Sequence, residues 1–411
     1  MKIAIVGSGF SSTSLLWHLA RQGNSDHTYY LVDRNREFGK GAPYTHSHES
    51  FYMNVPSKRL SISPEEPLHF IQWLKDQNQE AEFVPRSVFG EYLNQCLQES
   101  MGRLNNVVLI QSEAVSLREQ KSRLALSTIS GTTVEIDSLI LATGPVTPPV
   151  PQALQSLLNE RQLFQDPWAY VQSGKQYDHL VILGTGLTAC DLACHALRQG
   201  TKTLTLYSRH GLLPLNHNMN QTDTPSDFPV TAFLKMTSLA SKTRFLRDFC
   251  SQPGVSWQAC FDQLRPHIPV LWKALDHRQQ KYFLGRLKTF WNIHRHRLPP
   301  PTESILKEGF RLNKIKIVKN PLEIPQNQEA VINALGTSAD PLHQPFLKKL
   351  VDSNFILRHP LGLGFQSLNN NIFSLGCART GQDWEASAAK ELALQARDLA
   401  QIFKGVTAKA V

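Results

Sequence analysis

The chain has 411 residues, of which 41% are hydrophobic and 19% are charged. These values are typical of globular domains and exclude a mainly disordered, collagen-like or coiled-coil protein. The 43 lysine and arginine residues exceed the 34 acidic residues and give a formal net charge of +9. We therefore expect two or three domains and an anionic small-molecule ligand. Nucleic acid is disfavoured, because no basic tract is interleaved with aromatic residues.

Cysteine usage and the lengths of the apolar runs indicate a cytoplasmic protein. The six cysteines form no C-x-x-C pair and are too few for a disulfide framework, which is typical of a reducing compartment. No apolar run is long enough for a membrane-spanning helix, and the first run is too short for a signal-peptide core. We expect no membrane association and no leader, and the oligomeric state stays open.

The chain opens with a predicted parallel strand that ends in a glycine turn. The apolar run at residues 3–6 leads into Gly7 and Gly9, a segment of helical periodicity follows, and a second strand ends at Asp33. A Gly-x-Gly turn at the start of a helix lets backbone N–H groups approach a pyrophosphate, and the acid accepts hydrogen bonds from an adenosine ribose. Ser12 stands where such a motif has its third glycine. An ordinary tight turn is the alternative interpretation.

The same pattern recurs about 180 residues later in the chain. The apolar run at residues 179–183 leads into Gly184 and Gly186, and a helical segment and a further strand follow. No acid stands at the end of that strand, where the chain carries a polar and basic triplet: Ser208, Arg209 and His210. A cation and a hydroxyl group beside the ribose suit the 2′-phosphate of NADPH, and a solvated basic loop is the alternative.

Two further apolar strands, at residues 138–144 and 330–336, also end in glycine turns, and four prolines between residues 145 and 151 suggest a linker. Two dinucleotide sites in one chain suggest the common pairing of FAD with NAD(P)H, because hydride from the nicotinamide reduces flavin. We predict an α/β fold with two Rossmann-like dinucleotide-binding domains, of which the FAD-binding domain is split in sequence, and a helical insertion. The FAD-binding domain comprises residues 1–150 and about 340–411, the NAD(P)-binding domain 151–225 and about 300–339, and the insertion 226–299.

Together these motifs make the chain resemble the two-dinucleotide-binding-domain flavoproteins. Within them it is most similar to bacterial FAD/NAD(P)-binding proteins that are distantly related to flavin N-hydroxylating monooxygenases. The resemblance extends over nearly the whole chain and rests on the order and spacing of eight segments: residues 7–11, 38–44, 53–56, 141–144, 184–188, 208–214, 294–297 and 384–388.

The resemblance implies that the first domain holds FAD and the second holds NADPH. Asn54 and Val55 would approach the isoalloxazine, and Gly376 with a helix that begins near Trp384 would close over the flavin. The other residues expected at FAD are Gly7, Gly9, Phe10, Ser11, Ser12, Asp33, Arg34, Gly41, Val115, Ala142, Thr143, Gly144 and Glu385. Those expected at NADP are Gly184, Gly186, Leu187, Thr188, Ser208, Arg209 and His210.

We expect an FAD-dependent oxidoreductase that is reduced by NADPH, with N-hydroxylation of a small polar or anionic substrate as its most specific form. Two alternatives stay open: an FAD-binding redox sensor or partner protein without turnover, and a flavin oxidase or dehydrogenase with a vestigial NAD(P) site. The sequence assigns no catalytic base and shows no metal-ligand spacing.

Two groups in the predicted insertion have no role in this scheme. The run His294–Arg297 offers four donors, either to clamp an anion or as a solvated helix end. Large apolar side chains also recur near helical spacing and are interpreted as core rather than as an aromatic cage: Trp272, Phe283, Leu287 and Trp291.

Overall fold

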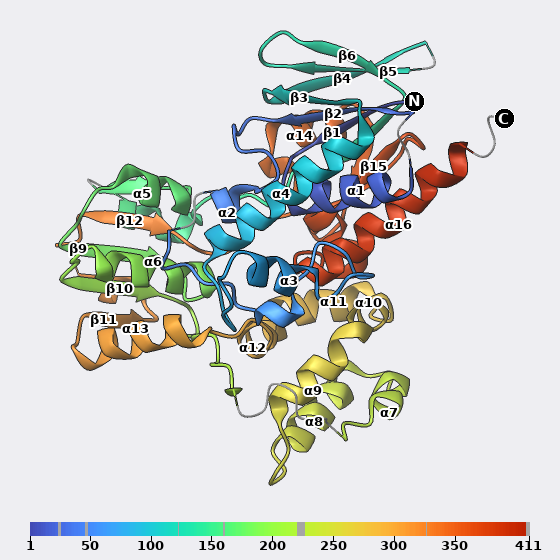
Figure 1. Cartoon of the computed structure of the whole chain (residues 1–411). Coiled ribbons are helices and arrows are strands. Elements are labelled where there is room, and N and C mark those ends of the chain that lie inside the picture. The colour runs from blue at the N-terminus through green and yellow to red at the C-terminus, as the bar shows by residue number, and fades with distance from the viewer. Residues whose placement is uncertain are drawn as a thin grey trace. The chain divides into compact units, whose positions relative to one another are not determined.

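A computed structural model describes residues 1–23, 26–45, 48–121, 123–158, 161–219, 227–325 and 327–407. The chain divides into two compact units. Unit 1 comprises residues 1–148, 337–381 and 385–411, and unit 2 comprises residues 149–336 and 382–384. Each unit contains a parallel sheet of five strands, so the predicted α/β fold is confirmed (Figure 1).

The sheet of unit 1 has the strand order β15-β7-β1-β2-β3, and all neighbouring strands are parallel. The strands are β1 (Lys2–Val6), β2 (Thr28–Asp33), β3 (Val107–Gln111), β7 (Ser138–Leu141) and β15 (Ile372–Ser374). The order reverses between β1 and β7. In open sheets of this kind, ligands bind at the carboxyl ends of the strands where the order reverses.

Both faces of this sheet are covered, as a buried parallel sheet requires. On one face, Ile3 and Ile5 pack against α1 (Phe10–Arg21), α4 (Arg86–Leu104) and α16 (Ala389–Thr407). On the other face, Ala4 and Val6 pack against a smaller antiparallel sheet and helix α14 (Figure 1). These elements are β4 (Ala114–Gln120), β5 (Arg123–Thr128), β6 (Thr133–Ile136) and α14 (Pro345–Asp352).

Shorter elements connect these layers of unit 1. They are α2 (Ala42–Thr45), η1 (Ser57–Arg59), α3 (His69–Asp76), η7 (Pro341–His343), β13 (Ile356–Arg358), β14 (Phe365–Ser367), η8 (Gly376–Arg379) and α15 (Thr380–Asp383), the last of which extends into unit 2.

Unit 2 repeats the same strand arrangement in the order β11-β10-β9-β12-β8, again with parallel neighbours. Leu180 and Ile182 face one helical layer, and Val181 and Leu183 face the opposite layer with Val150. The strands are β8 (Gln162–Phe164), β9 (His179–Leu183), β10 (Thr203–Tyr207), β11 (Ile315–Val318) and β12 (Ala330–Asn333). The covering helices are η2 (Gln152–Leu158), α5 (Pro167–Ser173), α6 (Leu187–Arg198) and α13 (Pro300–Arg311), and η6 (Pro321–Glu323) follows β11.

A helical insertion lies between β10 and α13 in the chain, and its described part begins at residue 227. It consists of α7 (Val230–Lys235), α8 (Leu239–Cys250), α9 (Trp257–Leu264), η4 (Arg265–His267), α10 (Ile268–Lys273), α11 (His277–Tyr282), the π turn η5 (Phe283–Leu287) and α12 (Lys288–Arg295). No described helix of either unit is long and apolar enough to cross a membrane.

The C-terminal helix begins later than the sequence analysis predicted. We expected it to begin near Trp384, whereas α16 begins at Ala389. Trp384 has a φ of +60°. This left-handed conformation is incompatible with a continuing right-handed helix, so the chain turns before α16.

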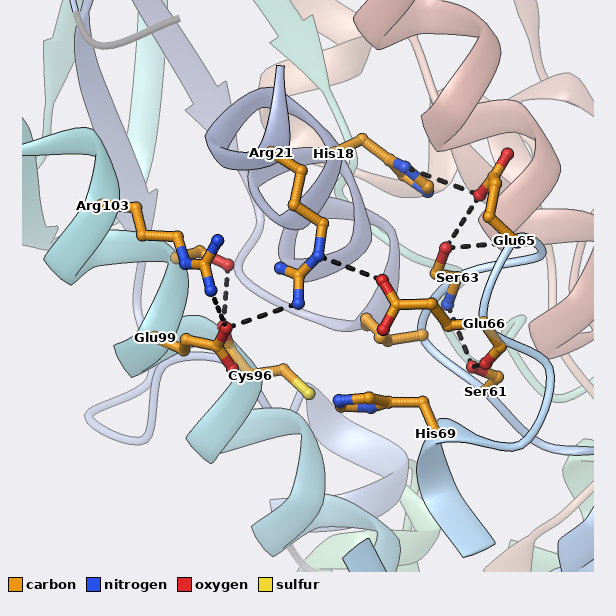
Figure 2. Close-up of polar contacts among 12 residues, drawn as sticks. His18, Arg21, Ser61, Ser63, Glu65, Glu66, His69, Cys96, Glu99 and Arg103 are labelled. Atoms are coloured by element: carbon orange, nitrogen blue, oxygen red, sulfur yellow. Dashed lines mark hydrogen bonds and ion pairs between the residues drawn. The ribbon is translucent and has the colours of Figure 1, made fainter. Parts of the chain in front are cut away.

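A polar network joins α1 to α4 and to the loop before α3 (Figure 2). The Arg21 guanidinium lies 3.1 Å from a carboxylate oxygen of Glu66 and 3.3 Å from one of Glu99. His18 is 6% exposed, and its Nδ1 lies 3.9 Å from Glu65. His69 contributes a 2.8 Å hydrogen bond between its Nδ1 and the Tyr92 hydroxyl. The network therefore contains one buried histidine, His18, and one half-buried histidine, His69.

Burial lowers the pKa of both His18 and His69 from the ordinary value, and for His18 this outweighs the opposing effect of Glu65. The unfolded chain then binds protons more readily than the folded one. We predict that the free energy of unfolding is highest above about pH 7 and decreases as the pH falls below the ordinary histidine pKa of about 6.5. Urea unfolding between pH 8 and pH 5.5 measures this, and His18→Gln should reduce the slope. A pH-independent stability over that range would contradict the prediction.

Candidate nucleotide-binding sites

The first glycine of the first motif is required by a close approach between two chain segments. Gly7 follows β1 with a φ of +100°, and a Cβ atom there would lie 2.2 Å from the carbonyl oxygen of Ala142. The segment after β7 is held at this place by a 2.9 Å hydrogen bond from the Ala142 N–H to the Val6 carbonyl. Any side chain at Gly7 would separate β1 from β7 at their carboxyl ends.

The second glycine is free of both constraints. Gly9 is the N-cap of α1 with φ −80° and ψ −163°, an extended conformation that any residue adopts. A Cβ atom at Gly9 would lie 3.4 Å from the Gly41 Cα, which is an ordinary contact. A side chain would therefore strain φ at Gly7 but not at Gly9. The N–H groups at the start of α1 are available to a ligand.

Ser12 is compatible with the tight turn although it replaces a glycine. Its side chain is fully buried, and its hydroxyl group donates a 2.5 Å hydrogen bond to the Gly7 carbonyl. The buried hydroxyl thus gives the Gly7 carbonyl of the turn a hydrogen-bond partner. Among the residues expected at FAD, Ser12 supports the loop that would contact the cofactor.

Asp33 is held in place at the carboxyl end of β2. Its Oδ2 accepts hydrogen bonds from the Ser8 N–H at 2.7 Å and the Ser8 hydroxyl at 2.9 Å, and its Oδ1 accepts one from the Asn35 N–H at 2.8 Å. Two carboxylate oxygens offer about four acceptor positions, so one remains for a ribose hydroxyl. Arg34 beside it is exposed.

The structure brings several distant residues of the first predicted site together. A Cβ atom at Gly376 would lie 3.1 Å from the Ser11 hydroxyl oxygen, and the Gly376 N–H donates to the side chain of Gln395 in α16 at 2.9 Å. Phe10 belongs to one apolar cluster with Met53, against which Val55 packs. The start of α1 therefore lies beside Gly376 and shares an apolar cluster with the segment around residue 54.

The remaining residues predicted at FAD do not all lie in unit 1, because Trp384 belongs to unit 2. Thr143 is adjacent to the position of a Gly7 Cβ atom, and the Gly144 carbonyl accepts a 3.0 Å hydrogen bond from Gln344. The chain from β3 to β4 passes the end of β2 and continues to Val115. Glu385 is buried in unit 1. Trp384 belongs to unit 2, where its ring contacts aromatic side chains of the insertion.

The second motif has the same geometry in unit 2. Gly184 follows β9 with a φ of +124°, and a Cβ atom there would lie 2.2 Å from the Ala334 carbonyl oxygen. Gly186 is the exposed N-cap of α6 with a φ of −75°, and apart from its neighbours in the chain no atom of the described residues lies within 4 Å of the Cβ position. Leu187 and Thr188 open this helix and are half-buried. The protein itself gives no reason for a glycine at residue 186.

Basic side chains gather at the carboxyl ends of β10 and β11. Arg209 and His210 are exposed just after β10, and the Ser208 N–H donates to the Val318 carbonyl of β11 at 3.0 Å. A Cβ atom at Gly211 would meet the Lys319 side chain, with Cε at 2.6 Å. Within the described ranges, neither Arg209 nor Lys319 has a carboxylate partner. The two cations are therefore available to an anion.

Sequence reasoning missed Lys319. One signal was available in the sequence: Lys319 directly follows the apolar strand β11, much as Arg209 comes two residues after the end of β10. About 100 residues separate the two strands in the chain, so their pairing could not be derived from the sequence.

The run His294–Arg297 serves the insertion. Arg297 is 3% exposed, pairs with Asp262 at 2.8 Å and donates to the Gln258 carbonyl at 3.1 Å. The His294 ring stacks on Phe261 with 5.0 Å between ring centroids. A solvated helix end is therefore wrong for Arg297, whose guanidinium joins α12 to α9.

Comparison with known proteins agrees with this geometry. Residues 4–146 match the model of the FAD-NAD(P)-binding family. The chain has the fold of the two-dinucleotide-binding-domain flavoproteins. This flavoprotein fold extends over nearly the whole chain, as the solved structures similar to it show. No curated protein matches the sequence.

Three solved structures illustrate the likeness. L-lysine 6-monooxygenase from Pseudomonas syringae is 13% identical, with a TM-score of 0.64 over 97% of this chain and 98% of that one. Reduced ornithine hydroxylase from Pseudomonas aeruginosa is 14% identical, with a TM-score of 0.62 over 98% of each chain. The ornithine N-hydroxylase of Kutzneria sp. 744, in a complex with reduced FAD, NADP+ and L-ornithine, is 13% identical, with a TM-score of 0.60 over 98% of this chain and 99% of that one.

The two glycines of each motif should respond differently to substitution. We predict that Gly9→Ala folds normally and loses most bound FAD, because the added methyl group occupies ligand space. Gly186→Val should keep its FAD and lose affinity for NADPH. Gly7→Ala should lower the melting temperature, because its Cβ overlaps the Ala142 carbonyl.

Flavin absorbance per protein, NADPH titration and thermal unfolding monitored by circular dichroism distinguish these variants. Gly102→Ala is the control for Gly9→Ala, because Gly102 is an exposed residue of α4 with an ordinary φ and open space at its Cβ position. A folded Gly9→Ala variant with the flavin content of the wild type would show that this turn does not hold the cofactor.

Proposed function

We propose that the protein is an FAD-dependent oxidoreductase that is reduced by NADPH. The observation that carries the proposal is the repeated glycine turn. In both units the first glycine is required by the fold, whereas the second has an ordinary backbone conformation and is the N-cap of a helix. Two such turns, one per parallel sheet, suit two dinucleotides.

The residues of unit 1 fit FAD. The N–H groups at the start of α1 would bind the pyrophosphate, and Asp33 would accept from the adenosine ribose. Ser8 orients the Asp33 carboxylate through two hydrogen bonds. When bound, FAD supplies the redox chemistry by accepting a hydride from the nicotinamide. The protein contributes binding and orientation, and we assign no side chain as a catalytic base.

The residues of unit 2 fit NADPH. The start of α6 would bind the pyrophosphate, and Arg209, with Ser208 beside it, would contact the 2′-phosphate. Lys319 adds a second cation from the neighbouring strand end. NADH lacks this phosphate, so the two cations would select NADPH.

The finer proposal is N-hydroxylation of a small polar or anionic substrate. It is supported by the fold shared with ornithine and lysine hydroxylases. We also propose a cytoplasmic location, since all six cysteines are free thiols. Among the described residues, no group of three or more His, Cys, Asp or Glu side chains could hold a metal ion.

The test begins with the purified protein. Denaturation should release FAD and no FMN. Incubation with NADPH, ¹⁸O₂ and a panel of amines and amino acids should yield a product that has gained one ¹⁸O atom, measured by mass spectrometry. NADPH consumption that yields only peroxide with every compound would argue against N-hydroxylation, and a colourless protein that cannot be reconstituted with FAD would exclude a flavoenzyme.

We predict that NADPH reduces the flavin more efficiently than NADH. Loss of a charge-assisted contact costs about 1.5–3 kcal/mol, which corresponds to a roughly ten- to hundredfold loss of affinity. Arg209→Ala and Lys319→Ala should each weaken NADPH binding roughly ten- to hundredfold. Both substitutions should leave the affinity for NADH nearly unchanged. Stopped-flow reduction with both nucleotides measures this.

Lys316→Ala is the matched control, because Lys316 is exposed on β11 but lies within the strand rather than at its end. Equal efficiency of the two nucleotides in the wild type, or a preference that both substitutions leave intact, would mean that the basic residues are solvated loop cations.

A further inference from the structure

The helical insertion contains a local irregularity directly before Lys288. Residues Phe283–Leu287 form a π turn between α11 and α12, and Lys288 is the first residue of α12. A π turn accommodates one extra residue and shifts the side chains that follow it around the helix axis. Such turns occur frequently at functional sites.

Trp384 meets this part of the insertion in a strained backbone conformation. Its φ of +60° is rare for a bulky side chain and persists only where the surroundings fix it. Its ring stacks on Trp272, with centroids 4.7 Å apart and an interplanar angle of 25°. It also meets the Phe283 ring edge-on at 5.2 Å and 84°. Trp272, which is 3% exposed, is core as expected, and Trp384 is only half-buried.

Lys288 extends toward the half-buried Trp384. Its ammonium nitrogen lies 5.8 Å from the centroid of the Trp384 ring, and the side chain is itself half-buried. Burial lowers the pKa of Lys288. No carboxylate in the described parts of the chain lies within ion-pair distance of it. The neighbouring Asp383 carboxylate lies 3.8 Å from Lys273 instead.

The surrounding segment offers no other neutralising group. Residues 257–299 contain eight lysine and arginine residues but only two acidic residues, Asp262 and Asp276. Asp262 pairs with Arg297, and Asp276 caps α11. A partly desolvated ammonium without an anion is unfavourable for the folded protein. An anionic ligand would remove that penalty.

We propose that Lys288 and Trp384 form a binding site for an organic carboxylate, with Trp272 stacked against Trp384 from the core. The ammonium group binds the carboxylate through charge-assisted hydrogen bonds, and the Trp384 indole contacts the apolar part of the ligand. The site lies within unit 2, so its occupation can be measured whether or not the protein holds a flavin.

Benzoate is the probe for this site, and isothermal titration calorimetry of the full-length protein as purified measures its binding. Benzyl alcohol keeps the apolar ring without the charge, and acetate keeps the charge without the ring. We expect benzoate to bind at least tenfold more tightly than either. Lys288→Met should lower the benzoate affinity at least tenfold, whereas Lys288→Arg should keep it within a few-fold of the wild type. Trp384→Phe should lower the affinity less than Lys288→Met does.

Lys281→Met is the matched control, since Lys281 is an exposed lysine of α11 in the same insertion. It should bind benzoate like the wild type. Thermal unfolding supplies a readout that separates a binding role from a structural one. Removal of an uncompensated charge should leave the melting temperature of Lys288→Met unchanged or raise it.

Three results would overturn the proposal. They are benzoate binding no tighter than that of benzyl alcohol, equal benzoate affinity in Lys288→Met and the wild type, and a lower melting temperature in Lys288→Met than in Lys281→Met. The last result would show that the contact of Lys288 with Trp384 stabilises the fold.

Discussion

The close contact between two strand ends, made possible by one glycine, is the constraint on which each unit depends. In unit 1 the Gly7 backbone lies against the Ala142 carbonyl, and in unit 2 the Gly184 backbone lies against the Ala334 carbonyl. In both places two neighbouring strands end side by side. The following helix, α1 or α6, begins three residues after the glycine. The free N–H groups of that helix therefore face the crevice where the strand order reverses. Both candidate sites follow from this contact.

Charge then distinguishes the two sites. At the end of β2 an acid is fixed by a serine of the glycine turn, which suits ribose hydroxyl groups. At the ends of β10 and β11 two cations have no acidic partner among the described residues, which suits a phosphate. The same backbone geometry thus presents an acceptor in one unit and cations in the other. In the helical insertion Arg297 is compensated by Asp262, whereas Lys288 lacks such a partner in the described chain.

The sequence predicted the elements whose signals are local. Apolar runs that end in glycines identified β1, β7, β9 and β12, and the acid or base after the next strand distinguished the two units. It could not predict features that depend on distant partners. Lys319 lies beside Gly211 only because β11 pairs with β10 across the insertion. Arg297 is buried because Asp262 faces it, and the left-handed Trp384 delays α16 because Trp272 and Phe283 hold its ring.

The proposed function requires that one chain binds FAD in unit 1 and receives electrons from NADPH in unit 2. An anaerobic titration of the purified, FAD-loaded protein with NADPH tests it most directly, with flavin absorbance near 450 nm as the readout. We predict that about one equivalent of NADPH bleaches one equivalent of FAD. We also predict that the Gly186→Val variant with full flavin content requires a much higher NADPH concentration. A bound flavin that stays oxidised in excess NADPH would show that NADPH is not its reductant.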